Sequence, residues 1–415
     1  MKVVFYFGWS FAETGGTQRA VLAIGSDLVA KGHSVTILSD CREIAEPFYP
    51  YDRAVKIWHY LEETGETVSL ENRHKVSAVD DAQKRKKSGS RQLQRVLPAY
   101  RRHRWQRRIR GRLPALQQAL EQENPDVCIV FTPEYASLVA NACPQRSFPL
   151  ILSFRNVPEY QFDEAAGFPK DPVAGANFKD NIGNADAFSV LIPEFSRFLS
   201  AHQSKPICFI PNGVQLPSDP ARPETSQQIV FTSRFDSAKR PKWLLEAFAK
   251  IAHKYPQWTL HMYGSGSNSE QAKNICAALG LSQQVKLHGP HRDLSEAYYK
   301  ASIFCLPSRY EGFSNSLAEA MSHGLACVAV DDCISNRALL KEGVGMLSKA
   351  GEGSEGLASA LDTLMANDDL RGAMGARARS QISQFTPQRV ADGWDGFLKS
   401  VVADYHQMHA GIKAS

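Results

Sequence analysis

The chain has 415 residues, which is too long for one ordinary domain, so two domains are expected from length alone. Hydrophobic residues make up 43% and charged residues 22%, and no apolar run approaches the ~18 residues of a membrane-spanning helix. The net charge of +5 is modest and no nucleic-acid motif accompanies it. Composition therefore argues against an integral membrane protein and against a nucleic-acid partner.

The N-terminal stretch MKVVFYFGWSFAETGG begins apolar, but no small-residue cleavage site follows it. A buried first strand is the better interpretation than a signal peptide. The eight cysteines show no CxxC pair and no metal-ligand spacing, and most lie in apolar runs. This pattern predicts buried free thiols in a reducing cytosol, with no disulfide and no zinc site.

The first half of the chain alternates strand-like and helix-like segments. A strand is predicted at Val3–Phe7, a helix at Thr17–Lys31 closed by Gly32, and a strand at Ser34–Leu38. This unit implies a parallel strand pair with a crossover helix. Further strands are predicted at Val127–Phe131, Leu150–Phe154, Ala187–Ile192 and Cys208–Ile210.

The pattern pauses at residues 211–228, where four prolines and no apolar periodicity mark a linker. It then restarts with strands at Ile229–Ser233, Thr259–Tyr263, Val285–Leu287, Ile303–Leu306 and Cys327–Val330. Helices are predicted at Pro241–His253, Glu270–Leu279, Leu294–Ala301, about 353–366 and about 386–405.

The predicted fold class is α/β, with two doubly wound domains in series. The expected division is 1–210, linker 211–228, 229–385, and a C-terminal helix in 386–415 that packs back on the first domain. Ligands of such sheets lie at the carboxyl ends of the strands, and two facing domains would place the site in the cleft between them.

The stretch SRYEGFSNSLAEAMSHG, residues 308–324, carries two glutamates eight positions apart. Glu311 lies in the loop after a predicted strand, and Glu319 about one turn into a helix that begins near Ser314–Ser316. A helix start binds anions, and a carboxylate on each side of it suits a sugar diphosphate. The alternative is structural: Ser316 and Glu319 have capping-box spacing, and Glu311 could be an ordinary loop residue.

Two cations and two glycine loops also favour a phosphate ligand. Arg234 and Lys239 follow the strand Ile229–Ser233, where fixed cations could stabilise a leaving diphosphate, although two solvated loop cations are the alternative. The loop Gly15–Thr17 opens the first helix, and the Gly264–Gly266 loop occupies the analogous place later. Each glycine loop is weak evidence alone, and neither is the GxGxxG fingerprint.

Together these segments resemble glycosyltransferase family 4, the retaining GT-B enzymes that use nucleotide sugars. The resemblance covers nearly the whole chain. It rests on GGT at 15–17, PNGV at 211–214, SRFDSAKRP at 233–241, YGSGS at 263–267 and LPSRYEGFSNSLAEAMSHGLACVAVDD at 306–332. Only the last segment is highly specific. Its EGF-x-N motif resembles the one in bacterial enzymes that build surface polysaccharide or lipid-linked oligosaccharide from UDP-sugars.

The resemblance implies that Glu311, Arg234 and Lys239 take part in catalysis, with Glu311 on the donor sugar and both cations on the diphosphate. Glu319 would hold the ribose, and uracil would lie near residues 289–291. The implied donor contacts also include Gly15, Gly16, Gly264, Pro290, Gly312, Phe313, Ser314, Asn315 and Ser316. No metal and no cofactor are implied, because the UDP-sugar is a substrate and Asp331–Asp332 lacks DxD spacing. Front-face attack would retain the anomeric configuration.

This sequence departs from the family pattern at several positions. The family often has glycine where Ser233 and Arg240 stand. Many members place a histidine after the strand that matches Leu150–Phe154, where this chain has Arg155 and Asn156. Arg155 and Asn156 are candidate donor or acceptor helpers, and for Arg155 a structural ion pair is the alternative.

From residue 84 to 112 the chain carries thirteen Lys or Arg and no Asp or Glu, with an apolar stripe at helical spacing. A basic amphipathic segment of this kind suits an anionic bilayer, which would place the enzyme at the inner face of the cytoplasmic membrane. A solvated hairpin with a core-facing stripe remains the main alternative, and nucleic acid a weaker one. The predicted membrane contacts are Arg101, Arg102, Arg104, Trp105, Arg107 and Arg108.

The predicted function is transfer of a sugar from a UDP-sugar to a lipid-linked or growing oligosaccharide acceptor bound by the first domain. Alternatives on the same fold are a sugar-nucleotide epimerase, a phosphorylase, or an inactive nucleotide-sugar-binding subunit. The two glutamates disfavour the epimerase, and the retained cations disfavour the inactive subunit.

Overall fold

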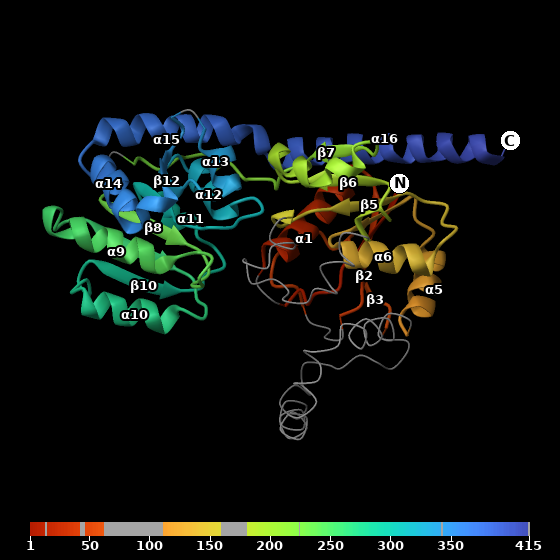
Figure 1. The fold of residues 1–415 in the computed structure, drawn as a ribbon, viewed down its shortest axis with the longest axis horizontal. Coiled ribbons are helices and arrows are strands. Elements are labelled where there is room, and N and C mark those ends of the chain that lie inside the picture. The colour runs from red at the N-terminus through yellow and green to blue at the C-terminus, as the bar shows by residue number, and fades with distance from the viewer. Residues whose placement is uncertain are drawn as a thin grey trace, which may run out of the picture. The chain divides into compact units, whose positions relative to one another are not determined.

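The computed structural model describes residues 1–12, 15–41, 46–61, 111–158, 181–223, 225–341 and 343–413. Two compact units divide the chain. Unit 1 comprises Met1–Ile210 and Ala391–Ser415, and unit 2 comprises Pro211–Val390. Both units are α/β (Figure 1).

Unit 1 contains a seven-stranded parallel sheet in the order β3-β2-β1-β4-β5-β6-β7. Most of its strands are apolar and buried along nearly their whole length, as expected for a parallel sheet covered on both faces. The half-exposed strand β3 was not predicted from the sequence. The strands are β1 Lys2–Tyr6, β2 Ser34–Ser39, β3 Lys56–His59, β4 Val127–Val130, β5 Leu150–Ser153, β6 Ala187–Val190 and β7 Ile207–Phe209.

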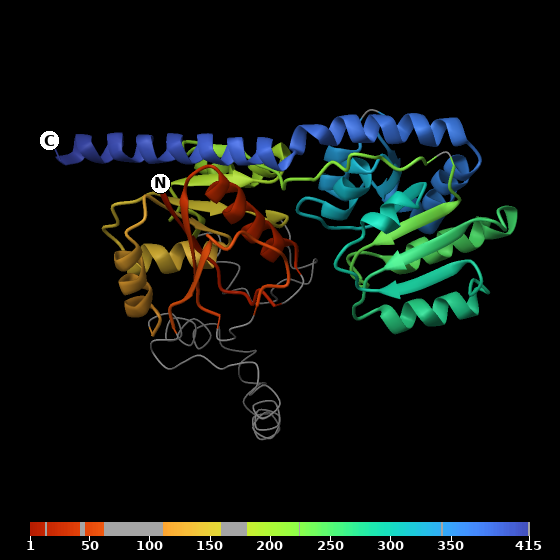
Figure 2. The same cartoon turned by 180° about the vertical axis from the view of Figure 1, so that it is seen from behind.

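The helices of unit 1 include the long C-terminal helix α16, whose residues from Ala391 onward belong to this unit (Figures 1 and 2). His33 Nε2 lies 2.9 Å from Asp395, and the Tyr405 hydroxyl donates to the Arg146 carbonyl at 2.8 Å. The helices are α1 Gly16–Ala30, α5 Leu113–Glu123, α6 Pro133–Ala142, the 3-10 segment η4 Pro193–His202 and α16 Pro387–Lys413. As predicted, Gly32 follows α1 with a positive φ of 83°.

Unit 2 contains a six-stranded parallel sheet in the order β10-β9-β8-β11-β12-β13. The strand order reverses between β8 and β11, which are hydrogen-bonded neighbours. The strands are β8 Gln228–Thr232, β9 Thr259–Tyr263, β10 Val285–Gly289, β11 Ile303–Leu306, β12 Ala326–Val330 and β13 Met346–Ser348. Two parallel, doubly wound sheets confirm the predicted fold class.

Helices cover the sheet of unit 2, with α9 packed against α10 and α14, and α12 against α15. They are α9 Pro241–Ile251, α10 Ser269–Ala278, α11 Ser295–Tyr299, α12 Asn315–Ser322, α13 Ile334–Leu339, α14 Gly353–Met365 and α15 Asp368–Ile382. Helix α15 was not predicted, because its buried positions include Gly375, Ala378 and Arg371 rather than a continuous apolar stripe. None of the described helices is both long enough and apolar enough to cross a membrane.

Two glycines after β9 let one loop support another. Gly264 has a φ of +137°, and a Cβ there would lie 1.9 Å from the Ser233 carbonyl oxygen. A Cβ at Gly266 would lie 2.5 Å from the Phe235 carbonyl oxygen, and Phe235 N donates to Ser265 O at 2.9 Å. The loop after β9 thus holds the loop after β8 by direct backbone contact, which only glycine permits.

A column of rings lies along the edge strand β10 and its neighbour β9. His261 Nδ1 lies 3.0 Å from His288 Nε2, and the ring of Tyr263 stacks on His288 at 4.3 Å between centroids. Burial lowers the pKa of both histidines, and the neighbouring imidazoles and Lys286 lower them further. Protonation of both rings is therefore unfavourable in the folded state.

We expect Gly264→Ala to lower the free energy of unfolding by about 3 kcal/mol, because the new methyl group meets backbone and the φ value is strained for an L-residue. Gly280→Ala is the matched control, since Gly280 also has positive φ (69°) but open space where its Cβ would lie. The control should lose about 1 kcal/mol. Urea unfolding measures both values, and equal losses would contradict the assigned backbone contact.

We expect the stability of unit 2 to decrease as the pH falls below about 6.5, the ordinary pKa of histidine. The unfolded chain then binds protons that His261 and His288 resist in the folded state, so this contribution is complete above that pH. Carboxylates elsewhere also respond to acid, so the measurement is a comparison between chains. A His288→Gln chain should show a shallower dependence from pH 6.5 to 5 in thermal melts, and an unchanged slope would refute this origin.

Candidate active site

The candidate site lies at the carboxyl edge of the sheet in unit 2, where the strand order reverses between β8 and β11. Parallel α/β sheets bind ligands at such a reversal, because the loops after the two strands diverge there. The loop 233–240 follows β8, and the loop 307–314 follows β11. Arg309 N donates to Ala238 O at 2.8 Å and joins the two loops.

Two of the predicted catalytic residues meet at this point. Lys239 Nζ lies 2.6 Å from Glu311 Oε1, with side-chain exposures of 11% and 15%. Lys239 Nζ also donates to the Tyr310 carbonyl at 3.2 Å, and its backbone N–H donates to Asp236 Oδ1 at 3.0 Å. A carboxylate that can accept hydroxyl protons thus lies beside a cation that can meet a phosphate.

Arg234, the third predicted catalytic residue, does not contact this pair. Its side chain is 70% exposed, and its guanidinium lies 3.2 Å from Asp236 Oδ2. Exposed ion pairs of this kind are weak, so the position of the side chain is loosely set. Arg234 therefore lies on the same loop as Lys239 without being part of the buried pair.

The start of helix α12 follows Glu311 directly. Its N-cap is Ser314, whose side chain makes no capping hydrogen bond. The alternative of a Ser316–Glu319 capping box is wrong, because Ser316 already lies in the first turn. The first backbone N–H groups of α12 are therefore available to an anion.

Side chains on both sides hold this turn in place. Phe313 is 3% exposed, and its ring centroid lies 5.9 Å from that of Phe385, so it anchors the loop rather than facing a ligand. Ser335 Oγ lies 2.7 Å from the Glu311 carbonyl and 2.8 Å from the Gly312 carbonyl. The carbonyl contacts fix the backbone on which the Glu311 side chain stands.

Glu319 lies in the second turn of α12 and accepts a hydrogen bond from the Tyr298 hydroxyl at 3.0 Å. That hydroxyl also lies 2.7 Å from Thr232 Oγ1 at the end of β8. The structure thus gives Glu319 a role in joining α12 to α11 and β8. A ribose contact by Glu319 remains a prediction.

Arg240 explains one departure from the family pattern. It has a φ of +48°, a region that favours glycine. Asp332 accepts from its two terminal nitrogens at 3.1 and 2.6 Å, and its guanidinium lies 4.2 Å from the Trp243 ring centroid. The bidentate pair stabilises a strained residue where the family often uses glycine.

The residues of unit 1 that were predicted to contact the donor or the acceptor include three with roles in the fold: Gly15, Gly16 and Arg155. Gly15 is the N-cap of α1, and Gly16 is its first residue. Arg155 is 6% exposed, donates to Ser153 Oγ at 3.0 Å and to Ile210 O at 3.3 Å, and lies 5.2 Å from the ring centroid of Trp394. Burial lowers the pKa of Arg155 to about 9. Arg155 thus joins β5, the end of β7 and α16 by hydrogen bonds and ring packing, while Asn156 is exposed.

Gly264 and Pro290 were predicted to contact the donor, and residues 101–108 to contact a membrane. Gly264 serves the fold, since the Ser233 carbonyl occupies the space next to it. Pro290 is exposed in the loop after β10. The predicted membrane residues, 101–108, lie outside the described residues.

A polar cluster at the corresponding edge of unit 1 was missed from the sequence. Tyr6, at the end of β1, donates to Asp40 Oδ2 at 3.2 Å, and its hydroxyl lies 3.2 Å from that of Tyr60. Arg112 pairs with Asp40, and burial raises the pKa of Tyr6. Part of the signal was available, because Asp40 directly follows β2, whereas Tyr60 follows β3, a strand that the sequence did not predict.

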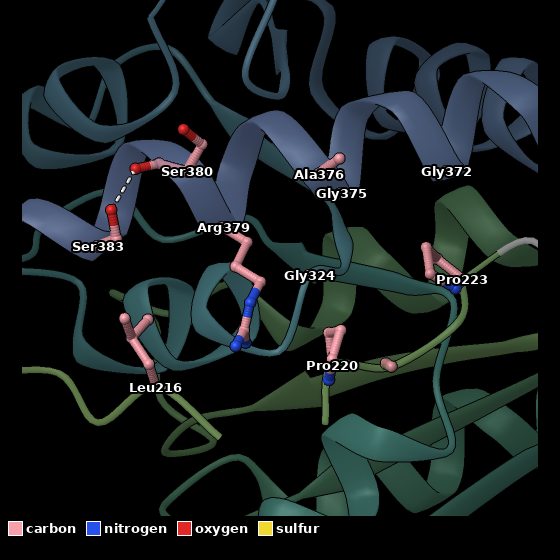
Figure 3. Close-up of a pocket in the computed structure, with 11 residues that line it drawn as sticks. Leu216, Pro220, Pro223, Gly324, Gly372, Gly375, Ala376, Arg379, Ser380 and Ser383 are labelled. Carbon is pink, nitrogen blue, oxygen red and sulfur yellow. Dashed lines mark hydrogen bonds between the residues drawn. The ribbon is translucent and has the colours of Figure 1, made fainter. Parts of the chain in front are cut away.

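A separate cavity of about 460 Å³ lies within unit 2, between α15 and the segment 216–223 (Figure 3). Arg379 extends from α15 and donates to the carbonyls of Ser322 and Pro217. None of the predicted site residues lines this cavity. It is a packing feature of the linker rather than the candidate site.

Comparisons with known proteins bear on the family and the fold of this chain. Family models match residues 15–213, described as "Glycosyl transferase 4-like domain", and residues 215–381, described as "Glycosyl transferases group 1". A Streptomyces coelicolor protein named exopolysaccharide phosphotransferase is 26% identical over 408 residues, which cover 97% of this chain. The aligned region spans only 41% of that relative's own length.

Two solved structures share the fold over almost the whole chain. Sucrose-phosphate synthase from Thermosynechococcus elongatus has a TM-score of 0.74 at 18% identity, covering 97% of this chain and 99% of that one. TarM from S. aureus has a TM-score of 0.72 at 14% identity, covering 96% of this chain and 100% of that one. With these two glycosyltransferase models matched in succession and GT-B enzymes as structural neighbours, the chain belongs to the glycosyltransferases and has the GT-B fold.

Proposed function

We propose that this chain transfers a sugar from a UDP-sugar to a lipid-linked or growing polysaccharide acceptor, with retention of anomeric configuration. The observation that carries the proposal is the buried meeting of Lys239 and Glu311 at the strand-order reversal, 2.6 Å apart. The uncapped start of α12 follows Glu311 immediately and offers N–H groups to a diphosphate.

In this proposal the carboxylate binds the sugar, and the cations and the helix start bind the diphosphate. Glu311 accepts hydrogen bonds from the hydroxyls of the donor sugar. Lys239, with Arg234 on the same loop, stabilises the charge that grows on the leaving diphosphate, as do the first N–H groups of α12. Because these groups already carry the needed charge, the proposal includes no metal ion and no cofactor.

The reaction itself exchanges one bond at the anomeric carbon. The oxygen of the acceptor hydroxyl forms a bond to that carbon on the face from which UDP departs. The bond from the carbon to the phosphate oxygen breaks, its electron pair stays on the phosphate, and the phosphate takes the proton of the acceptor. The products are UDP and the extended glycan.

The names of similar proteins support the donor and the acceptor class. The S. coelicolor relative is named for exopolysaccharide, and the TarM structure is titled as a complex that contains UDP and alpha-GlcNAc-glycerol. On that basis we assign a UDP-sugar donor and a polymeric acceptor to this chain in the proposal.

A panel of UDP-sugars, screened for protection against thermal unfolding, should identify the donor, because a ligand that binds only the folded state raises the melting temperature. Release of UDP from that donor then separates the alternatives. An epimerase alters the sugar without releasing UDP, and an inactive subunit binds the donor without turnover.

We expect Glu311→Ala to lower transfer by at least ~10²-fold, the scale for losing a polar contact to the transition state. Glu355→Ala is the matched control, since Glu355 lies on the surface of the same unit and forms an ion pair with the exposed Lys250. UDP release under saturating donor measures both. Near-normal turnover by the Glu311 variant would overturn the role assigned to this residue.

The proposal extends to location at the inner face of the cytoplasmic membrane, through the basic segment that ends at Arg112. We expect the chain to float with vesicles containing anionic lipid and to lose this binding when Arg101, Arg102, Arg104, Arg107 and Arg108 are all changed to Gln. Binding that survives the five substitutions would remove the membrane role. Loss of binding in 0.5 M salt is the electrostatic control.

A further inference from the structure

The two polar side chains at the start of α12 are both turned toward other partners. Ser314 occupies the N-cap, where serine commonly accepts from the second or third N–H of the helix. Here its Oγ donates to Asn336 Oδ1 at 2.6 Å, and it makes no capping bond. The next residue, Asn315, accepts from Asn212 Nδ2 at 2.8 Å. The polar side chains of Ser314 and Asn315 are thus hydrogen-bonded to α13 and to the segment that contains Asn212.

Asn336 belongs to the first turn of α13, directly after β12. It is fully buried, and its amide group faces the N-cap of α12. Within the described part of the chain, its Nδ2 has no hydrogen-bond partner. A buried donor without a partner is uncommon and destabilising, so this amide is retained at a cost to stability. The fold alone does not account for an asparagine at this place.

We propose that Asn336 is a positioning residue that holds the Ser314 hydroxyl away from its own helix and so keeps the start of α12 open to the donor diphosphate. This inference rests on the proposed function. A serine that capped the helix would occupy the same N–H groups that the phosphate needs. The capped form would be a competing state, and it would weaken the apparent affinity in proportion to its population.

The contact between Asn212 and Asn315 applies the same restraint one residue later. Asn212 lies in the PNGV segment at the beginning of unit 2, far from α12 in the sequence. This segment therefore has a specific role, which is to keep the Asn315 amide to the side of the helix start. Ser314 itself is fully buried, so its hydroxyl is not exposed to a ligand.

The test is a double-mutant cycle with UDP as the probe, measured by calorimetry. Asn336→Leu keeps a similar volume and releases the Ser314 hydroxyl. We expect it to raise the Kd for UDP about 5-fold, as when capping leaves about one fifth of the molecules competent. In a Ser314→Ala chain the same substitution should change the Kd by less than ~2-fold, because no hydroxyl remains to cap the helix.

Two further readouts separate positioning from a general loss of structure. Donor KM should rise in the Asn336→Leu chain while kcat is retained, since the bound complex is unchanged. Without ligand, hydrogen exchange of the amides at 315–317 should slow in Asn336→Leu and not in the double variant. Leu339→Val, a buried change in the same helix α13, is the control for loosened packing and should leave exchange at 315–317 unslowed.

The outcomes decide the inference in both directions. It is overturned if Asn336→Leu leaves the Kd unchanged, if the double variant is as weak as the single one, or if exchange at 315–317 does not slow. A wild-type chain that binds no UDP would instead overturn the proposed donor. The exchange data need no ligand, and they would still decide whether Asn336 holds Ser314 off the helix.

Discussion

The ion pair between Lys239 and Glu311 is the interaction on which the candidate site depends. Each side chain is mostly removed from water, so each charge requires the other. They come from loops after β8 and β11, which are adjacent only because the strand order reverses between them. The start of α12 follows Glu311 directly in the chain, so the reversal brings a cation from the loop after β8 to a carboxylate and the first N–H groups of a helix.

Close backbone packing between neighbouring loops supports the position of Lys239 and Glu311. Gly264 and Gly266 let the loop after β9 contact the loop that carries Arg234 and Lys239. Arg240, at the end of the latter loop, is held in a strained conformation by Asp332 from the loop after β12. Glycines and a strained φ value occur at this place because the backbones of the loops must lie close together. Stability of the fold and geometry of the site are thus determined by the same contacts.

Several side chains that looked functional in the sequence prove to have structural partners. Arg155 is buried against Trp394 and the ends of two strands, and Phe313 packs on Phe385. Conversely, Asn336 and Ser335 carried no recognisable motif, although they determine the geometry around α12. A side chain's type limits which bonds it can make, but its neighbours in space decide which of them it does make.

The sequence by itself determined the alternation of strands and helices, the two parallel sheets, and the positions of Glu311 and Lys239 at strand ends, because apolar periodicity and loop chemistry are local properties. It missed β3, whose half-exposed residues lack a continuous apolar run, and α15, whose buried face mixes Met374 and Ile382 with two small residues and an arginine. Only the tertiary structure decided that Lys239 pairs with Glu311, that Arg234 stays exposed, and that Ser314 turns to Asn336. These contacts join residues far apart in the chain or choose between competing partners, and only the packing of the sheet and its loops selects among them.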